Sequence, residues 1–301
     1  MSTKILLGLS LPFLLCAQEP NPTQSAENKS VHTEIPAPIY RVNVVARTTK
    51  AINYGHGAER TKVGLQGTVL LPEARGEARI EPSTGAVEVK AKLENLASPD
   101  RFGRQYLTYV MWAITPEGRA TNLGEIVTDP DNDGKLKTAT ELQTFALVVT
   151  AEPYYAVTQP SDVVVMENVI LPDTQGRIQT VDARYELLHR GEYTLDVAAA
   201  EDSAEDSAQP MVSRKEYEAL LALYQAQNAI QLAEAAGAGD HAAEMLAKAE
   251  TRLSDAQAIY ERKPKNETVV TLAREATQTA EDARLVALRR QSGNASGAAE
   301  R

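Results

Sequence analysis

The chain has 301 residues, of which 31 are Lys or Arg and 41 are Asp or Glu, and its formal net charge is -10. This acidic balance argues against a nucleic-acid partner, because phosphates favour a basic surface through counterion release. The single Cys and the four His exclude a disulfide framework, a Cys-rich zinc site and an iron–sulfur cluster. With 43% hydrophobic and 24% charged residues the composition is globular, and the length allows about two domains.

The N-terminus has the pattern of a secretory signal peptide. In residues 1–17, Lys4 precedes an apolar run that ends at Cys16 and Ala17. A charged start, an apolar stretch of this length and small residues at its end are typical of exported proteins. The run is shorter than the ~20 apolar residues that span a bilayer, and no second such run follows. We therefore expect a mature chain without a transmembrane helix, located in the periplasm or at the outer membrane.

Cys16 leaves two interpretations open. It resembles the lipidated Cys of a bacterial lipoprotein, with Ala17 and Gln18 after it, and an acyl chain would anchor the protein to a membrane. The lipoprotein motif, however, has a small residue immediately before the Cys, and here that residue is Leu15. Cleavage after Ala17 would instead remove the Cys. Residues 18–37 are rich in Pro, Asn, Ser and Gln and are predicted to form a disordered tether.

Residues 38–172 show the alternation and the turn residues of a β domain. The clearest strand is 86–93, where apolar residues alternate with charged ones and a period of two places them on opposite faces. The two sets are Val87, Val89, Ala91 and Leu93 on one face, and Glu88, Lys90 and Lys92 on the other. Further strands are expected at 39–46, 63–71, 76–82, 106–114, 120–127, 145–151 and 163–170. Short strands at this spacing predict an all-β sandwich with antiparallel sheets.

Four segments of this β region carry a family resemblance. They are YVMWAITPEG (109–118), LGEI (123–126), FALVVTAEP (145–153) and QPSDVVVM (159–166). Together they resemble the extracytoplasmic β domain of anti-sigma-K factors, over residues 76–170. The resemblance implies the fold alone, because a shared fold does not carry function. The sigma-binding segment and the membrane helix of such factors have no counterpart in this sequence.

Two connecting segments follow the β domain. Residues 173–199 are predicted to form a further hairpin or an extended appendage. Residues 200–212 contain a doubled Ala-Glu-Asp-Ser sequence and end shortly after a Pro. Low complexity and several acidic residues among small ones are typical of an interdomain linker.

Residues 213–291 have the three- and four-residue periodicity of helices. Gly residues at 237 and 239 and the Lys-Pro-Lys-Asn sequence at 263–266 divide the region into three. Asp240 and Asn266 are the expected N-caps of the second and third helices. The sequence therefore predicts a separate all-α domain of three antiparallel helices, with residues 292–301 as a disordered tail.

Three helical segments carry a second resemblance: ALYQAQNAIQLAEAAG (222–237), AKAETRL (247–253) and AREATQTAEDAR (273–284). They resemble an Ala-rich helical domain of unknown function in bacterial envelope proteins, over residues 215–291. That domain often lies between a lipoprotein signal and an OmpA-like peptidoglycan-binding domain. No OmpA-like sequence follows here, so peptidoglycan binding is not implied. Because Ala-rich helices associate readily, we expect an envelope protein partner or self-association through this region.

One string of residues resembles a metal site. Asp129, Asp131 and Asp133 alternate before Gly134, as in the first half of an EF-hand loop. The twelfth position of such a loop is a Glu, whereas here it is Thr140. A hairpin turn rich in Asp and Gly explains the same residues and is favoured over calcium. The three Asp are therefore weak metal candidates, and we predict neither a metal nor a cofactor.

Aromatic residues suggest a second possible site. Tyr106, Tyr109 and Trp112, with Tyr154 and Tyr155 further on, form either a platform for sugars and peptides or a core Trp with Tyr around it. Alternation would place Tyr106 and Trp112 on one face and Tyr109 on the other. The four His are scattered, and the chain contains no nucleophile or phosphate-binding motif, so no catalytic residue is predicted.

Together these patterns predict an exported, non-catalytic cell-envelope protein. Its β module and its helical spacer would have a structural or adaptor role and contact a partner. The alternative is an extracytoplasmic module that binds a glycan or calcium through the loops of the β domain.

Overall fold

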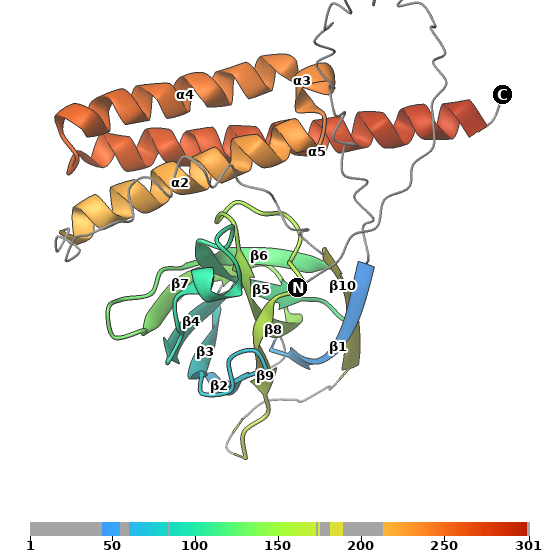
Figure 1. Cartoon of the computed structure of the whole chain (residues 1–301). Coiled ribbons are helices and arrows are strands. Elements are labelled where there is room, and N and C mark those ends of the chain that lie inside the picture. Colours follow the sequence, from blue (N-terminus) through green and yellow to red (C-terminus); the bar gives the residue numbers. More distant parts are fainter. Residues whose placement is uncertain are drawn as a thin grey trace, which may run out of the picture. The chain divides into compact units, whose positions relative to one another are not determined.

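The computed structural model describes residues 44–54, 60–83, 85–172, 174, 181–188 and 213–299 (Figure 1). The predicted signal peptide with Cys16, the tether and the acidic linker lie outside these residues, and so do His32, His56 and His189.

The first part of the described chain is built from antiparallel strands. Their bounds are β1 (Val44–Asn53), β2 (Thr61–Gly67), β3 (Arg75–Ser83), β4 (Ala86–Glu94), β5 (Thr108–Ile114), β6 (Ala120–Ile126), β7 (Gly134–Thr140), β8 (Thr144–Glu152), β9 (Val164–Val169) and β10 (Val181–Leu188). A short 3-10 helix, η1 (Pro99–Phe102), lies between β4 and β5. The strand β7 was not among the predicted ones, and β10 falls within the predicted appendage.

Eight of these strands form a nearly closed barrel, in the order β6–β5–β8–β9–β2–β3–β4–β7 (Figure 1). At the seam β6 and β7 are neighbours, and the bridge described there joins Thr128 and Gly134. β1 pairs with β10 over most of its length and with the start of β8 at its end. The predicted β region is therefore confirmed. Its strands form a barrel instead of the predicted sandwich, because pairing runs unbroken from β6 through to β7.

Apolar side chains from all eight barrel strands fill the interior. In β4 the predicted alternation holds, with Val87, Val89, Ala91 and Leu93 buried in this core. Each such large aliphatic side chain contributes about 1.5–3 kcal/mol to stability when it is fully buried. The barrel is thus a packed core.

The outer surface of β2, β3, β4 and β7 carries charged side chains, and we call it the charged face. Its members alternate in sign across neighbouring strands: Lys62, Glu77, Arg79, Glu81, Glu88, Lys90 and Lys137. Lys90 Nζ donates to Glu81 Oε2 at 3.0 Å, and this hydrogen bond lowers the pKa of the Glu81 carboxyl. Opposite charges at cross-strand positions stabilise a sheet modestly while they remain in water.

The outer surface of β5 and β8 has the opposite character, and we call it the covered face. It consists of Val110, Trp112 and Ile114 of β5 and Ala146 and Val148 of β8. All five side chains are fully buried, although they belong to a different cluster from the barrel interior. Because both faces of these strands are buried, the strands have continuous apolar sequences without polar alternation.

The second part of the described chain is helical, as predicted. It comprises α2 (Arg214–Ala235), the short α3 (Ala238–His241), α4 (Ala243–Arg262) and α5 (Glu267–Ala299). α5 packs along both α2 and α4, and its contact positions are mainly Ala (Figure 1). Small residues at these positions let the helices approach closely. None of the described helices is both long and apolar enough to cross a membrane.

Helix ends agree in part with the predicted ones. Gly237 adopts a left-handed conformation with φ 78°, which ends α2 in the usual way. The Asn266 side chain accepts a hydrogen bond from the backbone N–H of Thr268 at 3.0 Å, so this predicted cap is confirmed. The cap predicted at Asp240 is wrong, because Asp240 lies inside α3 and α4 begins after Ala242.

Candidate functional site

The Asp129 loop has the geometry of a turn. Asp129 Oδ1 accepts hydrogen bonds from the backbone N–H groups of Asp131 at 3.0 Å and Asp133 at 2.9 Å. Asn132 has a positive φ of 64°, and its carbonyl accepts from Leu96 N–H. The part of the chain that the structure describes contains no group of three His, Cys, Asp or Glu side chains placed for a metal ion. The side-chain oxygen that calcium would need is thus engaged in closing the turn.

The aromatic residues are buried and do not form a platform. Trp112 and Tyr109 are completely buried, and Tyr106 is 3% exposed, so the predicted sugar platform is wrong. Tyr106 precedes β5 and shares the barrel core with Tyr109, whereas Trp112 lies on the covered face. The prediction that Tyr106 and Trp112 share a face fails because alternation does not extend beyond the end of a strand. Tyr109 donates to the carbonyl of Ala97, and burial raises its pKa.

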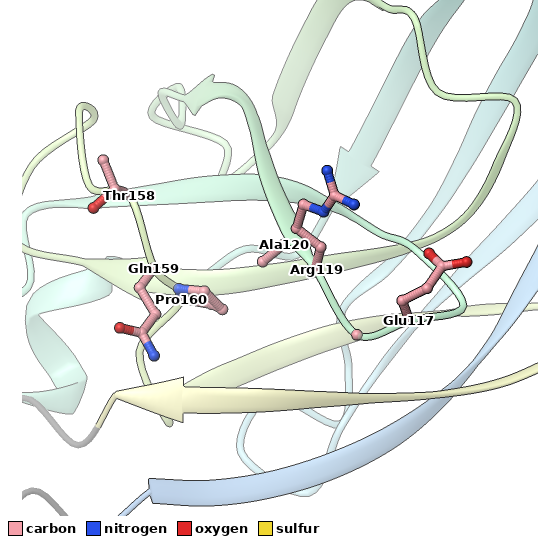
Figure 2. A pocket seen from close by; sticks show the side chains of 7 residues that line it. Glu117, Arg119, Ala120, Thr158, Gln159 and Pro160 are labelled. Carbon is pink, nitrogen blue, oxygen red and sulfur yellow. The ribbon is translucent and has the colours of Figure 1, made fainter.

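A surface depression of about 800 Å³ lies between the β5–β6 turn and a segment that follows β8 (Figure 2). Its polar groups are Glu117 and Arg119 on one side and Thr158 and Gln159 on the other. A hydrogen bond from the Thr115 side chain lowers the pKa of Glu117. In Figure 2 the polar ends of the labelled side chains point in different directions. The depression can therefore offer single hydrogen bonds, but its side chains do not converge on one point.

The most extensive polar site in the described part is the contact between the barrel and the helices, which we call the junction. One cluster of buried side chains contains the covered face together with residues of α2, α4 and α5, such as Ala229, Leu246 and Ala283. Residues 153–158, which follow β8 and which we call the docking segment, contribute Tyr154 and Val157 to the same cluster. The helical region is thus in contact with the barrel through a shared apolar core.

A buried ion pair lies in the junction. Glu281 and Arg284, both on α5, form a two-pronged pair with Nε–Oε2 and Nη2–Oε1 distances of 2.7 and 2.8 Å. The docking segment supplies two further donors to the same carboxylate: Tyr154 Oη to Oε2 at 2.6 Å and Thr158 Oγ1 to Oε1 at 2.8 Å. Glu281 is completely buried and Arg284 is 8% exposed. Such a charge is tolerated in the interior only when it is paired and hydrogen-bonded.

A second polar contact lies at the edge of the junction. Glu125 of β6 accepts hydrogen bonds from Gln225 of α2, at 2.5 Å, and from Arg274 of α5. The Arg274 guanidinium also lies over the ring of Tyr155, 4.4 Å from its centroid. Gln225 in turn accepts from the backbone N–H of Tyr155 at 3.2 Å. One strand, two helices and the docking segment therefore meet around a single carboxylate.

The docking segment is held rigidly from the barrel side. Asn122 of β6 donates to the carbonyls of Tyr155 and Val157, both at 2.8 Å. At the base of the segment, Glu152 accepts from Thr150 Oγ1 at 2.5 Å and from Ser161 N–H at 2.7 Å. These bonds fix the position from which Tyr154 and Thr158 reach α5.

Sequence reasoning did not single out Glu281 or Arg284. A Glu and an Arg three residues apart on a helix are typical of a solvent-exposed pair. The surrounding sequence, AEDARLVA, is rich in Ala and gives little contrast between a buried and an exposed face. The only local signal is that both charges fall on the stripe of Ala280, Ala283 and Ala287, which are all buried.

Comparisons with known proteins give no family for this chain. No model of a known protein family matches it, and no curated protein matches it either. The resemblances of its two halves therefore stay predictions.

Proposed function

We propose that this protein is exported to the bacterial cell envelope and acts there as a non-catalytic adaptor. In this proposal the barrel and the helices form one rigid body that contacts partner proteins. The observation that carries it is the junction, where the docking segment donates two hydrogen bonds to the buried Glu281–Arg284 pair. A flexible spacer does not need such a network. An adaptor that holds two surfaces in a fixed relation does, because buried polar contacts can select one arrangement of the packed parts.

Export is supported by the sequence of residues 1–17, which has the charged start and apolar run of a signal peptide. Acylation of Cys16 would anchor the protein at the outer membrane, whereas cleavage after Ala17 would leave it in the periplasm. The resemblance of residues 215–291 to a helical domain of envelope proteins points to the same compartment.

An exposed pair of tyrosines supports partner binding by the helical region. Tyr217 and Tyr224 lie seven residues apart, on the same side of α2, and are 45% and 54% exposed. Tyr is enriched at protein interfaces, where its ring supplies apolar area and its hydroxyl a hydrogen bond. Both rings are available on a helix whose other sides pack against the barrel and against α5.

The first experiment determines the mature N-terminus. The full-length protein with a C-terminal tag is produced in a Gram-negative host, the cells are fractionated, and the tagged protein is analysed by mass spectrometry. We expect a processed chain in the envelope fraction that begins at an acylated Cys16 or at Gln18. Full-length protein with Met1 in the cytoplasm would contradict the proposal.

The second experiment tests the partner surface. A photo-crosslinking amino acid replaces Tyr224 in cells, and the matched control carries it at Val69, a 92% exposed position on the barrel side. We expect a discrete cross-linked product from position 224 that is absent at position 69 and is lost with Tyr217→Ala. Equal products from both positions would contradict the assignment of the surface.

The glycan- or calcium-binding alternative has less support from the geometry. The Asp129 carboxylate already accepts two backbone hydrogen bonds, and the aromatic residues that would stack on a sugar are buried. The depression of Figure 2 offers polar groups without a common focus.

A further inference from the structure

The two halves of the junction come from parts of the chain that are far apart in sequence. Tyr154 and Thr158 belong to the docking segment on the barrel side, whereas Glu281 and Arg284 belong to α5. We call the latter pair, with Ala280 and Ala283 beside it, the slot. Segment and slot are joined by hydrogen bonds and packing alone.

The connection between the halves is long. Leu188 ends β10, which is paired with β1 on the barrel side, and Ser213 precedes α2. At ~3.3 Å per extended residue, the intervening residues 189–212 can span up to roughly 80 Å. This reach exceeds the ~30 Å diameter of a small domain. The slot of one chain can therefore reach the docking segment of a neighbouring chain as readily as its own.

The chemistry of the junction makes it specific without making it large. Its helical side is lined by small Ala residues, and its position is set by the four hydrogen bonds to the Glu281 carboxylate. Contacts between domains of one chain are typically more polar than permanent interfaces, so the domains can separate. A slot that has separated holds a charged pair that only the matching Tyr and Thr hydroxyls complete. The best available substitute is the identical segment of a second copy.

We propose that the junction also forms between two copies of this chain, with the slot of each copy receiving the docking segment of the other. This exchange deepens the proposed adaptor function and rests on it. It creates no new contact and breaks none, which is why exchange of an identical element is a low-cost route to a dimer. Because a flexible connection holds segment and slot of one chain at an effective concentration of roughly millimolar, the monomer dominates in dilute solution. The exchanged dimer forms at millimolar concentration or on a crowded membrane.

Complementation between two defective variants tests this proposal. The segment variant, Tyr154→Ala with Thr158→Ala, retains the slot, and the slot variant, Glu281→Ala with Arg284→Ala, retains the segment. Neither can close the junction within one chain, whereas a mixed dimer can close one of its two junctions. The full-length mature proteins are refolded together at high concentration, and one of them is isotope-labelled for native mass spectrometry. We expect the mixed dimer to be at least tenfold more abundant than either dimer of identical variants.

Hydrogen exchange shows where such a dimer is joined. The α5 amides around Glu281 should be protected in the mixed dimer and exchange faster in each variant alone. Mixing labelled and unlabelled segment variant is the control and should give no dimer. Absence of a mixed dimer at millimolar concentration, or equal amounts of mixed and unmixed dimers, would overturn the proposal.

The wild-type chain provides a test that does not depend on the folding of a variant. Refolding from urea at millimolar concentration should give a dimer that persists after rapid dilution, whereas refolding at micromolar concentration should give monomer. A wild-type chain that remains monomeric under both conditions would contradict the exchange. The export and cross-linking experiments above do not depend on this result, so failure of the exchange and failure of the adaptor function are distinguishable.

Discussion

The charged face and the covered face belong to the same barrel and share the same interior, but they solve the exposure of a sheet in different ways. On the charged face every second residue of β4 is a charged side chain in water, paired across strands as Lys90 is with Glu81 and Glu88. On the covered face the corresponding positions of β5 are Val110, Trp112 and Ile114, which are completely buried. One face is finished by solvent and the other by the rest of the chain.

This difference determines where the helices can pack. Ion pairs such as those of the charged face contribute little to stability and lose hydration when they are covered. Apolar side chains such as those of the covered face gain about 25 cal/mol for each Å² removed from water. The helical region shares a buried cluster with the covered face, and the polar groups at their contact are paired. The pattern of polarity on the barrel thus selects one side for packing.

The largest expected effect follows from removing the central side chain of the covered face. Trp112→Ala deletes a fully buried ring and its hydrogen bond from Nε1 to Thr150 Oγ1 at 2.8 Å. We expect a loss of about 4 kcal/mol in the free energy of unfolding, since large-to-small core substitutions of Trp cost this much. Urea unfolding should be followed by circular dichroism, because the variant lacks the single Trp.

The matched control on the charged face is Lys90→Ala. It removes side-chain contacts with two exposed carboxylates, and unfolding should be nearly unchanged. Equal destabilisation by the two substitutions would mean that the two faces do not differ in the way described.

The two faces also differ in how well sequence reveals them. In β4 one face is buried and the other is in water, so the alternation of Val87 with Glu88 is visible and the strand was correctly predicted. In β7, Leu136 is the main apolar side chain, and its neighbours Lys135 and Thr138 give only a weak alternation after an Asp-rich turn. This strand was therefore missed. Closure into a barrel depends on pairs such as β2 with β9 and β4 with β7, which local periodicity does not encode.

The junction was beyond sequence reasoning for a related reason. Asn266 was predicted as a cap because a cap acts on its own helix, and the same kind of local signal failed at Asp240, which lies inside α3. Glu281 and Tyr154 meet across more than a hundred residues. Nothing in the sequence near either residue distinguishes a buried partner from a solvated side chain, so only the tertiary fold brings them together.

A second prediction sharpens the comparison by testing the charge that the covered side retains. Arg284→Met keeps the length of the side chain but leaves the buried Glu281 carboxylate without its counter-charge. We expect a loss of about 3 kcal/mol in the free energy of unfolding, because removing one member of a buried pair strands the other. Arg289→Met, at an exposed position on the same helix, is the control. If both variants unfold like the wild type in urea, the ion pair does not contribute as described.

A third prediction concerns the helix that carries the slot. Asn266→Ala removes the side-chain acceptor for Thr268 N–H at the start of α5 and should cost about 1 kcal/mol. Asp240→Ala removes the cap that the sequence suggested, at a position without a side-chain capping bond to a helix, and should have a much smaller effect. Thermal melts followed at 222 nm measure both. A larger loss for Asp240→Ala would reverse the assignment of the caps.

The smallest expected effect lies in the loop that links β6 to β7 and so connects the side of the covered face to the charged face. Asp129→Ala removes one oxygen that accepts two backbone hydrogen bonds and should cost about 0.5 kcal/mol, whereas Asp131→Ala should have almost no effect. A calcium site would behave differently, because both carboxylates would bind the ion and both substitutions would abolish stabilisation by calcium. Melts with calcium and with EDTA distinguish the two cases. Coincident wild-type melts agree with a turn closed by Asp129 alone, and a calcium-dependent shift lost in both variants would require an ion in this loop.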